Sequence, residues 1–271
     1  MDLPNVQTYL RPNDLESVKD WQQGWAWLSG GTWLFSQAQP NITTLVDLEK
    51  FGWSEIEVTP DGLAIGAACI QNQLLEFSFP EHWQGTKALE SAVSHLGSFK
   101  VSHIATVGGN ICLALPVSTF APVMIALGAT YEIWHGGFAY RVRALEFQTG
   151  VQQTILQPGE VLRKIWIPAS NLEWRTSFQR ICVASDGYAL STVVAAFNSQ
   201  LNQVRFGLGA CVSTPRLVEF SCIPTVEEIA DVLDEQLPLP DFVEDDRGSA
   251  SYRRQITQVL MERSLFELCH P

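Results

Sequence analysis

The segment from Ile104 to Gly128 constrains the fold more strongly than any other part of the chain. It contains two adjacent glycines, Gly108 and Gly109, between Thr106 and Asn110. Adjacent glycines permit positive φ and let a ligand approach the backbone closely, and the flanking side chains are short and polar. This composition predicts a glycine turn that leads into a helix and suits the binding of a phosphate group.

A shorter segment of the same composition lies nearer the N-terminus. Below, it is called the first segment, and the one around Gly108 and Gly109 is called the second segment. Ser29, Gly30, Gly31 and Thr32 follow the apolar run Trp25–Leu28, which predicts a strand. One Gly-Gly pair is typical of ordinary turns, whereas two such segments can converge on one diphosphate. Neither segment has the Gly-x-Gly-x-x-Gly spacing of a Rossmann dinucleotide site.

Composition and charge narrow the class of protein. The chain has 271 residues, of which 46% are hydrophobic, and this is enough for packed cores. Its formal net charge of −12 would repel the phosphates of nucleic acid, so we expect no nucleic-acid partner. The sequence has no secretory leader and no apolar run approaching the roughly 18 residues that span a bilayer. We therefore expect a cytoplasmic protein with no membrane span.

The distribution of cysteine and histidine indicates no metal site. The six cysteines are scattered without a C-x-x-C pair, and the five histidines are equally dispersed. We expect the cysteines to be buried thiols. There is no H-E-x-x-H motif and no G-x-S-x-G nucleophile elbow, so we expect no metal ligand and no catalytic residue.

Turn residues and hydrophobic spacing predict the elements of the first part of the chain. A capping box at Asn13–Glu16 predicts a helix that ends before Gly24. The other predicted elements are strands at Ile42–Val46, Glu55–Val58, Leu63–Ile65 and Val161–Ile167, helices at Thr86–Gly97 and Ser118–Gly128, and a hairpin turning at Gly136-Gly137.

The remainder of the chain predicts strands followed by helices. Strands are expected at residues 190–197 and 203–212, and a capping box at Thr225 predicts a helix that ends before Pro238. The last helix is expected over residues 249–268, with Tyr252, Ile256, Val259 and Leu260 on one face. Pro168 and the following polar residues predict a linker, and the whole pattern indicates an α+β protein.

The two glycine segments resemble those of the FAD-binding subunit of the molybdenum hydroxylases, the xanthine dehydrogenase and carbon monoxide dehydrogenase families. That family has Gly-Gly-Thr in the first segment and Thr-Ile-Gly-Gly-Asn in the second; the first recurs at residues 30–32, and the second recurs at residues 106–110 with Val107 in place of isoleucine. Further matches occur at 204–209, 214–216, 246–249 and 252–254. The resemblance therefore runs from about residue 10 to about residue 265 and rests on several motifs in the same order.

The resemblance implies two domains. Residues 1–168 are expected to form a two-part FAD-binding domain of the vanillyl-alcohol-oxidase type. Residues 169–271 are expected to form a small α+β domain of the carbon monoxide dehydrogenase flavoprotein type, with a three-stranded antiparallel sheet and helices.

The resemblance also implies the residues that contact FAD. The glycines of both segments would donate backbone N–H groups to the diphosphate, and Thr32, Thr106 and Asn110 would add side-chain donors. From their pattern alone, Leu28 and Leu162 are core residues. The cofactor-binding residues expected in full are Trp27, Leu28, Ser29, Gly30, Gly31, Thr32, Trp33, Leu34, Thr106, Val107, Gly108, Gly109, Asn110, Thr119, Leu162 and Gln179.

Several positions depart from the family pattern. A usual aspartate is Thr119 here, a frequent flavin-facing aromatic residue is Leu96, and a usual lysine is Gln179. An Arg-Asn pair common ahead of the central segment is Ser102-His103. Each change removes a polar or stacking contact, so we expect FAD to be held more loosely than is usual for the family.

The function implied is electron transfer within a molybdenum hydroxylase. Iron-sulfur and molybdopterin-binding subunits would be partner chains, because this chain lacks a cluster-binding set of cysteines, and FAD would pass electrons to a small-molecule acceptor. One alternative is a degenerate scaffold subunit that no longer binds FAD. Another is a free-standing flavin oxidase, which would need a general base that no matched position supplies.

Overall fold

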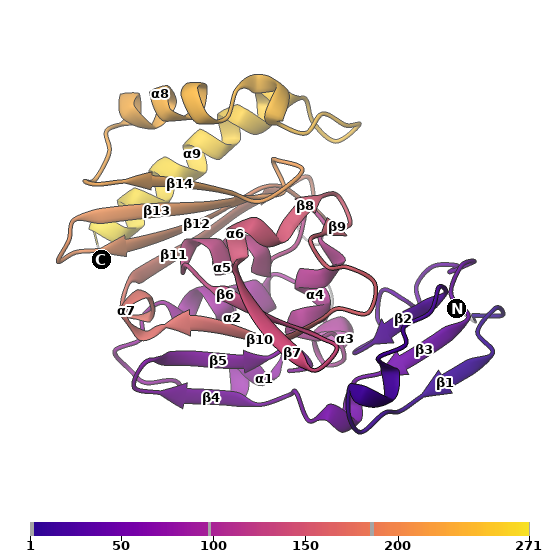
Figure 1. Ribbon diagram of the computed structural model, residues 1–271. Helices are drawn as coiled ribbons and strands as arrows, with labels where there is room; N and C mark the ends of the chain where they lie inside the picture. The colour runs from indigo at the N-terminus through magenta and orange to yellow at the C-terminus, as the bar shows by residue number, and fades with distance from the viewer. Residues whose placement is uncertain (1–2, 97–98, 185–186, 271) are drawn as a thin grey trace.

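The computed structural model describes residues 3–96, 99–184 and 187–270, which form a mixed α/β fold. Its strands belong to an N-terminal three-stranded sheet, a central five-stranded sheet, a C-terminal four-stranded sheet and a two-stranded ribbon. Figure 1 shows the N-terminal sheet to the right of the central part of the molecule and the four-stranded sheet above that part. The α+β class predicted from the sequence therefore agrees with the observed arrangement.

The N-terminal sheet is parallel and has the order β1-β3-β2, with β1 at Thr8–Leu10, β2 at Trp25–Leu28 and β3 at Thr44–Asp47. The strand predicted at Trp25–Leu28 is thus confirmed. The helix predicted after Asn13 is wrong, because only a 3₁₀ turn forms at Glu16–Val18.

Local contacts explain this short turn. The Asp14 carboxylate accepts a hydrogen bond from the Ser17 backbone N–H at 2.9 Å, which caps one turn only. Trp21 then packs against Trp27, with ring centroids 4.5 Å apart, and Gly24 turns the chain into β2 with φ +85°. Packing of the tryptophans therefore overrides the capping signal.

The central sheet is antiparallel and has the order β4-β5-β10-β6-β7. The predicted hairpin is confirmed, because β6 and β7 turn at Gly136 and Gly137, whose φ values are +50° and +94°. The strand bounds are Ile56–Thr59 for β4, Gly62–Gly66 for β5, Thr130–His135 for β6, Phe138–Arg143 for β7 and Val161–Pro168 for β10.

Short helices connect and cover this sheet. The predicted helices beginning near Thr86 and Ser118 are confirmed as α2 and α5, and Gly128 follows α5 with φ +60°. The predicted end of the first at Gly97 lies outside the described residues. The remaining elements are a 3₁₀ helix at Glu49–Phe51, α1 at Gln73–Glu76, α2 at Thr86–Ser94, α3 at Phe99–Ser102, α4 at Val107–Leu113, α5 at Phe120–Ala126, α6 at Ala144–Phe147, β8 at Gln148–Gly150, β9 at Gln153–Thr154 and α7 at Ala169–Leu172.

The C-terminal sheet has four strands rather than the three expected, in the order β11-β12-β13-β14. The strands predicted at residues 190–197 and 203–212 correspond to β12 and β13, whereas neither β11 nor β14 was predicted from the pattern of residues; the polar residues Ser177, Gln179 and Arg180 hide the strand pattern of β11. The bounds are Arg175–Cys182 for β11, Ala189–Asn198 for β12, Gln203–Gly209 for β13, Arg216–Phe220 for β14, Val226–Gln236 for α8, Leu239–Asp241 for a 3₁₀ helix and Ala250–Cys269 for α9.

The two C-terminal helices begin where the sequence predicts. Thr225 and Glu228 form the predicted capping box at the start of α8. Helix α9 crosses the outer face of the four-stranded sheet (Figure 1) and buries Ile256 and Leu260 as expected. Tyr252 of the same predicted face is 45% exposed. The neighbouring Arg253 is buried instead, and its Nη1 donates to the Leu190 carbonyl and its Nη2 to Asp245.

Helix α5 lies against the inner face of the four-stranded sheet and joins the two halves of the chain. One hydrophobic core contains Val123 of α5 together with Val194 and Ala196 of β12. The approach is close, since a Cβ added at Gly207 of β13 would lie 2.0 Å from the Pro122 carbonyl oxygen. The residues after Pro168 form the short helix α7 where a linker was expected. The proposed domain boundary at residue 168 therefore falls directly between β10 and α7.

Candidate cofactor site

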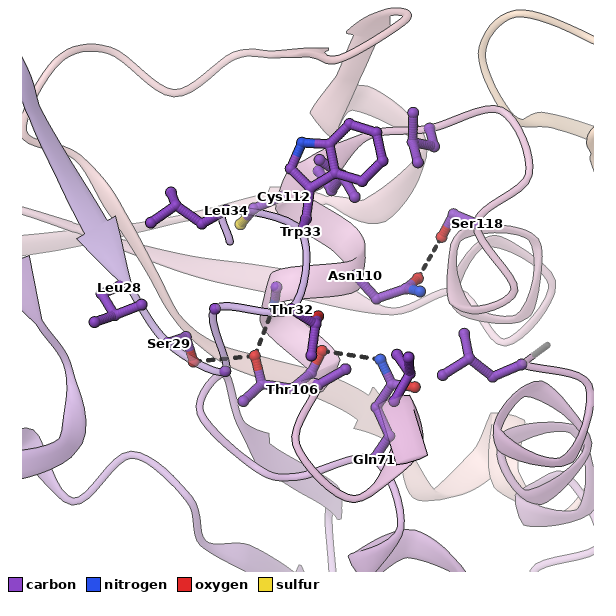
Figure 2. A pocket seen from close by; sticks show the side chains of 18 of the residues that line it. Leu28, Ser29, Thr32, Trp33, Leu34, Gln71, Thr106, Asn110, Cys112 and Ser118 are labelled. Atoms are coloured by element: carbon purple, nitrogen blue, oxygen red, sulfur yellow. Dashed lines mark hydrogen bonds between the residues drawn. The ribbon is translucent and has the colours of Figure 1, made fainter. Parts of the chain in front are cut away.

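The two glycine segments meet at one cavity of about 540 Å³. Figure 2 shows the side chains of the first segment facing those of α4 and of the turn before α5. A cavity of this volume lies within the range of about 300–1,000 Å³ that is usual for small-molecule and cofactor sites. The convergence predicted from the sequence is therefore present in the structure.

The first segment provides backbone donors that the protein itself does not use. In the described part of the chain, none of the backbone N–H groups of residues 30–34 donates a hydrogen bond to another group. The segment is held by the Phe35 N–H, which donates to the Gly31 carbonyl at 2.9 Å, and Gly31 has φ +70°. All of residues 30–34 line the cavity, and successive backbone N–H groups of this kind form an anion-binding concavity.

The second segment differs from its prediction in two ways. The glycines lie within the first turn of α4, and neither has positive φ. Their N–H groups are already used, since Gly108 donates to the Ala67 carbonyl at 2.9 Å and Gly109 to Thr106 Oγ1 at 3.1 Å. In this structure both N–H groups are thus paired within the protein, and their expected donation to a diphosphate stays a prediction.

Close packing explains why Gly30 and Gly108 are glycines, and backbone conformation explains Gly31. A Cβ added at Gly30 would lie 2.1 Å from the Ile104 carbonyl oxygen, and one at Gly108 would lie 2.6 Å from Ala67. Gly31 needs its positive φ. At Gly109 an added Cβ would meet only Thr106 Oγ1, at 2.8 Å, and this glycine lines the cavity. Gly109 is thus the position where a side chain would enter the ligand space.

Side-chain hydrogen bonds hold the two segments together. Ser29 Oγ donates to Thr106 Oγ1 at 3.0 Å, so the hydroxyl at the N-cap of α4 connects both segments (Figure 2). Gln71 Nε2 donates to the Thr106 carbonyl at 3.1 Å. Ser118 Oγ donates to Asn110 Oδ1 at 2.5 Å, so this bond does not use the two hydrogens of the Asn110 amide group.

Five of the expected cofactor residues lie outside the cavity lining: Val107, Gly108, Thr119, Leu162 and Gln179. Val107 and Leu162 are buried in the hydrophobic core. Thr119 is 8% exposed at the N-terminus of α5, and its hydroxyl has no partner in the described chain. Gln179 Nε2 donates to Glu267 of α9 at 2.8 Å, on the far face of β11.

Leu96, at the position where the family often has a flavin-facing aromatic residue, lines the cavity. The structure also adds residues that the sequence did not place in the site. The further lining residues are Gln71, Val101, Ala105, Cys112, Leu113, Leu115, Val117, Ser118 and Tyr188. Most come from segments whose apolar character fits a core equally well, so only their adjacency to the central glycines could have indicated them.

The cavity offers neutral groups only. No Asp, Glu, His, Lys or Arg side chain of the described chain lines it. Burial raises the pKa of the Cys112 thiol to about 12, so this thiol stays neutral at physiological pH. Such a site can bind an anionic cofactor through hydrogen-bond donors, but it contains no nucleophile or general base for a substrate.

The fold and this neutral cavity between two glycine segments are those of a cofactor-binding protein. Residues 5–170 match the family described as the FAD binding domain in molybdopterin dehydrogenase. The chain belongs to this family of oxidoreductase flavoproteins, and FAD is the cofactor of the family.

Relatives of known activity include medium chains of such enzymes. The glyceraldehyde dehydrogenase medium chain of Sulfolobus acidocaldarius is 23% identical over 98% of this chain and 99% of its own length. The carbon monoxide dehydrogenase medium chain of Afipia carboxidovorans is 24% identical over 88% of this chain and 86% of its own length. The xanthine dehydrogenase/oxidase of Rattus norvegicus is 32% identical, but the match spans only 49% of this chain and 11% of the rat protein.

Solved structures show the same fold. A chain of carbon monoxide dehydrogenase from Hydrogenophaga pseudoflava superposes with a TM-score of 0.84 at 20% identity, covering 99% of both chains. A chain of quinoline 2-oxidoreductase from Pseudomonas putida 86 gives a TM-score of 0.79 at 22% identity, covering 99% of this chain and 98% of that chain. In the described residues, no helix is long and apolar enough to cross a membrane.

Proposed function

We propose that this chain is the FAD-carrying electron-transfer subunit of a molybdenum hydroxylase. One observation supports this most directly: residues 30–34 all line the cavity, and their backbone N–H groups have no hydrogen-bond partner in the described chain. Buried or half-buried N–H groups are normally paired, so a run without partners indicates a ligand with several acceptor oxygens. The diphosphate of FAD has that chemistry.

The residues of this chain would divide the binding as follows. Residues 30–34, which are most of the first segment and the two residues after it, would hold the diphosphate with their backbone N–H groups. Gly109 would leave room for the cofactor beside the Ser29–Thr106 hydrogen bond, and the Asn110 amide would supply a side-chain donor. Leu96, Leu113 and Tyr188 would exclude water from the apolar part of the cofactor.

When bound, FAD supplies a group that exchanges electrons singly or in pairs. That property would link one-electron iron-sulfur clusters on a partner subunit to a small-molecule acceptor. No set of three or more His, Cys, Asp or Glu residues that could hold a metal occurs in the described chain. We propose that an iron-sulfur subunit and a molybdopterin-binding subunit carry the remaining cofactors and that substrate oxidation takes place there.

Two finer assignments belong to the same proposal. We propose that the three-stranded and five-stranded sheets are the two parts of a vanillyl-alcohol-oxidase-type FAD domain, with residues 169–271 as the second domain. We also propose a cytoplasmic location, because all six cysteines are free thiols and such thiols are typical of reducing compartments.

A flavin-free scaffold remains the competing function, and one experiment separates it from the proposal. The purified chain is incubated with FAD, dialysed and examined for flavin absorption bands, and the same is done with a Gly31→Val variant. Binding of one FAD by the unaltered chain and its loss in the variant are expected, because Gly31 needs φ +70°. No flavin in either protein would support the scaffold.

The partner subunits are tested in the native complex. Size measurement of the protein isolated from its source should show a hetero-oligomer that contains iron and molybdenum. Recovery only as a single chain with full substrate turnover would contradict the proposed role.

A further inference from the structure

Arg180 lies near the end of β11 on the opposite face of the strand from Gln179. Successive side chains of a strand point to opposite faces. Ser177 and Gln179 both donate to the Glu267 carboxylate of α9, at 2.5 and 2.8 Å. The Arg180 guanidinium points the other way, towards the end of α2 and the loop before β12.

All three nitrogens of this guanidinium donate hydrogen bonds. Nη1 donates to the His95 carbonyl at 2.5 Å and Nη2 to the Gly187 carbonyl at 3.0 Å. Nε lies 3.0 Å from Cys182 Sγ. A planar guanidinium can hold two acceptors at once in a fixed relative position, which the single ammonium group of lysine does far less well.

One of the two carbonyls belongs to a well-fixed segment. The His95 ring stacks on Phe178, with centroids 4.9 Å apart and an interplanar angle of 13°. Its Nδ1 also lies 2.8 Å from the Ser91 carbonyl of α2. The end of α2 is therefore anchored to the same strand that carries Arg180.

The two carbonyls directly precede two residues of the cofactor cavity. His95 is followed by Leu96 and Gly187 by Tyr188, and both of these line the cavity. Tyr188 is 65% exposed, and the Arg247 guanidinium lies 5.9 Å from its ring centroid. Because the side chain of Tyr188 is so exposed, its position depends largely on how its backbone is held.

We propose that Arg180 is a positioning residue that fixes Leu96 and Tyr188 relative to each other and thereby controls how long FAD is retained. Arg180 does not itself line the cavity. The effect on FAD retention rests on the proposed function, whereas the positions of the backbone at Leu96 and at Tyr188 can be measured without cofactor. If these two backbone positions suit FAD in only a tenth of the molecules, the apparent affinity for FAD falls about tenfold.

The test compares Arg180→Met and Arg180→Lys with the unaltered full-length chain. Arg175→Met is the matched control, since Arg175 lies on the same strand and has no side-chain interaction in the described chain. Two quantities are measured: the rate of FAD release, followed by the rise in flavin fluorescence, and hydrogen exchange of peptides that contain Leu96 or Tyr188 in the FAD-free protein.

We expect Arg180→Met to release FAD about tenfold faster and to exchange faster in those two peptides, with other peptides unchanged. Arg180→Lys should resemble Arg180→Met more than the unaltered chain, because lysine lacks the fork. Unchanged FAD release and exchange in both variants would overturn the inference, and so would full rescue by lysine. If neither the unaltered chain nor any variant binds FAD, the proposed function fails. The hydrogen-exchange data then still decide whether Arg180 holds the backbone at Leu96 and at Tyr188.

Discussion

A pair of alanine substitutions at adjacent glycines separates binding from folding in the central segment. Gly108 and Gly109 are neighbours in the first turn of α4, yet the structure gives them different surroundings. A Cβ at Gly108 would lie 2.6 Å from both Cβ and the carbonyl oxygen of Ala67. A Cβ at Gly109 would meet only the Thr106 hydroxyl, at 2.8 Å, on the cavity side.

The expected magnitudes follow from these contacts. Alanine is favoured over glycine inside a helix by about 1 kcal/mol, so both variants gain this amount. At Gly109 the gain offsets the cost of disturbing the Thr106 cap, about 1 kcal/mol, and the free energy of unfolding should hardly change. At Gly108 forced overpacking against backbone costs about 1–3 kcal/mol and displaces the bond to Ala67, worth about 1 kcal/mol more.

FAD affinity should be reduced more by Gly109→Ala than by Gly108→Ala, the reverse of the order for stability. The methyl group of Gly109→Ala would occupy space beside the cofactor, and overpacking of about 1–3 kcal/mol corresponds to roughly a fivefold to 150-fold loss of FAD affinity. Urea unfolding of the FAD-free proteins and titration with FAD measure the two effects separately. Unchanged FAD affinity in Gly109→Ala, or equal loss of stability in both variants, would refute the assignment of Gly109 to the ligand space.

Three further predictions concern the cofactor and the C-terminal half. Cofactor released from the loaded protein should run as FAD and not FMN on chromatography, because the unpaired donors of residues 30–34 suit a diphosphate; recovery of FMN would contradict this. Thr119→Asp and Gln179→Lys should leave FAD affinity within about twofold, since neither side chain lines the cavity, and a tenfold tightening of FAD binding in titration would contradict the structure. Partial burial alone would raise the pKa of Asp245, but hydrogen bonds from Arg247 and Arg253 outweigh it and lower the pKa to about 2. The ionised Asp245 should add at most about 2 kcal/mol to the free energy of unfolding, fully above pH 4 and progressively less as the pH falls towards 2. Asp245→Asn should remove this acid dependence from unfolding curves measured across that pH range. An unchanged acid dependence in the variant would refute the prediction.

The sequence predicted the fold best where local signals agree with packing. Gly136 and Gly137 both need positive φ, so the hairpin between β6 and β7 was readable from its turn. The Thr225 capping box was equally reliable because both of its hydrogen bonds form. The capping signal at Asn13–Glu16 failed, because only one 3₁₀ turn forms there before Trp21 packs against Trp27. The strand pattern failed at β11, whose polar residues Ser177, Gln179 and Arg180 make hydrogen bonds to other elements.

The cofactor site was predicted in outline but not in its chemistry. Composition alone located both glycine segments, and the structure brings them together. It could not show that the Gly108 N–H donates to Ala67 or that Gly30 packs against the Ile104 carbonyl, because those partners are distant in sequence. The pairing of strands likewise decided that Gln179 faces α9 whereas Arg180 faces the end of α2 and the loop before β12, and no motif records this difference between two adjacent residues.

The position of α5 has a consequence for the order of events during synthesis. Its residues belong to the same hydrophobic core as Val194 and Ala196 of β12, which the ribosome adds about 70 residues later. Until β12 emerges, one face of α5 has nothing to cover it, and Tyr188 is not yet available to the cavity. We therefore expect flavin loading to follow completion of the chain, and nascent chains that end near residue 170 to depend on chaperones.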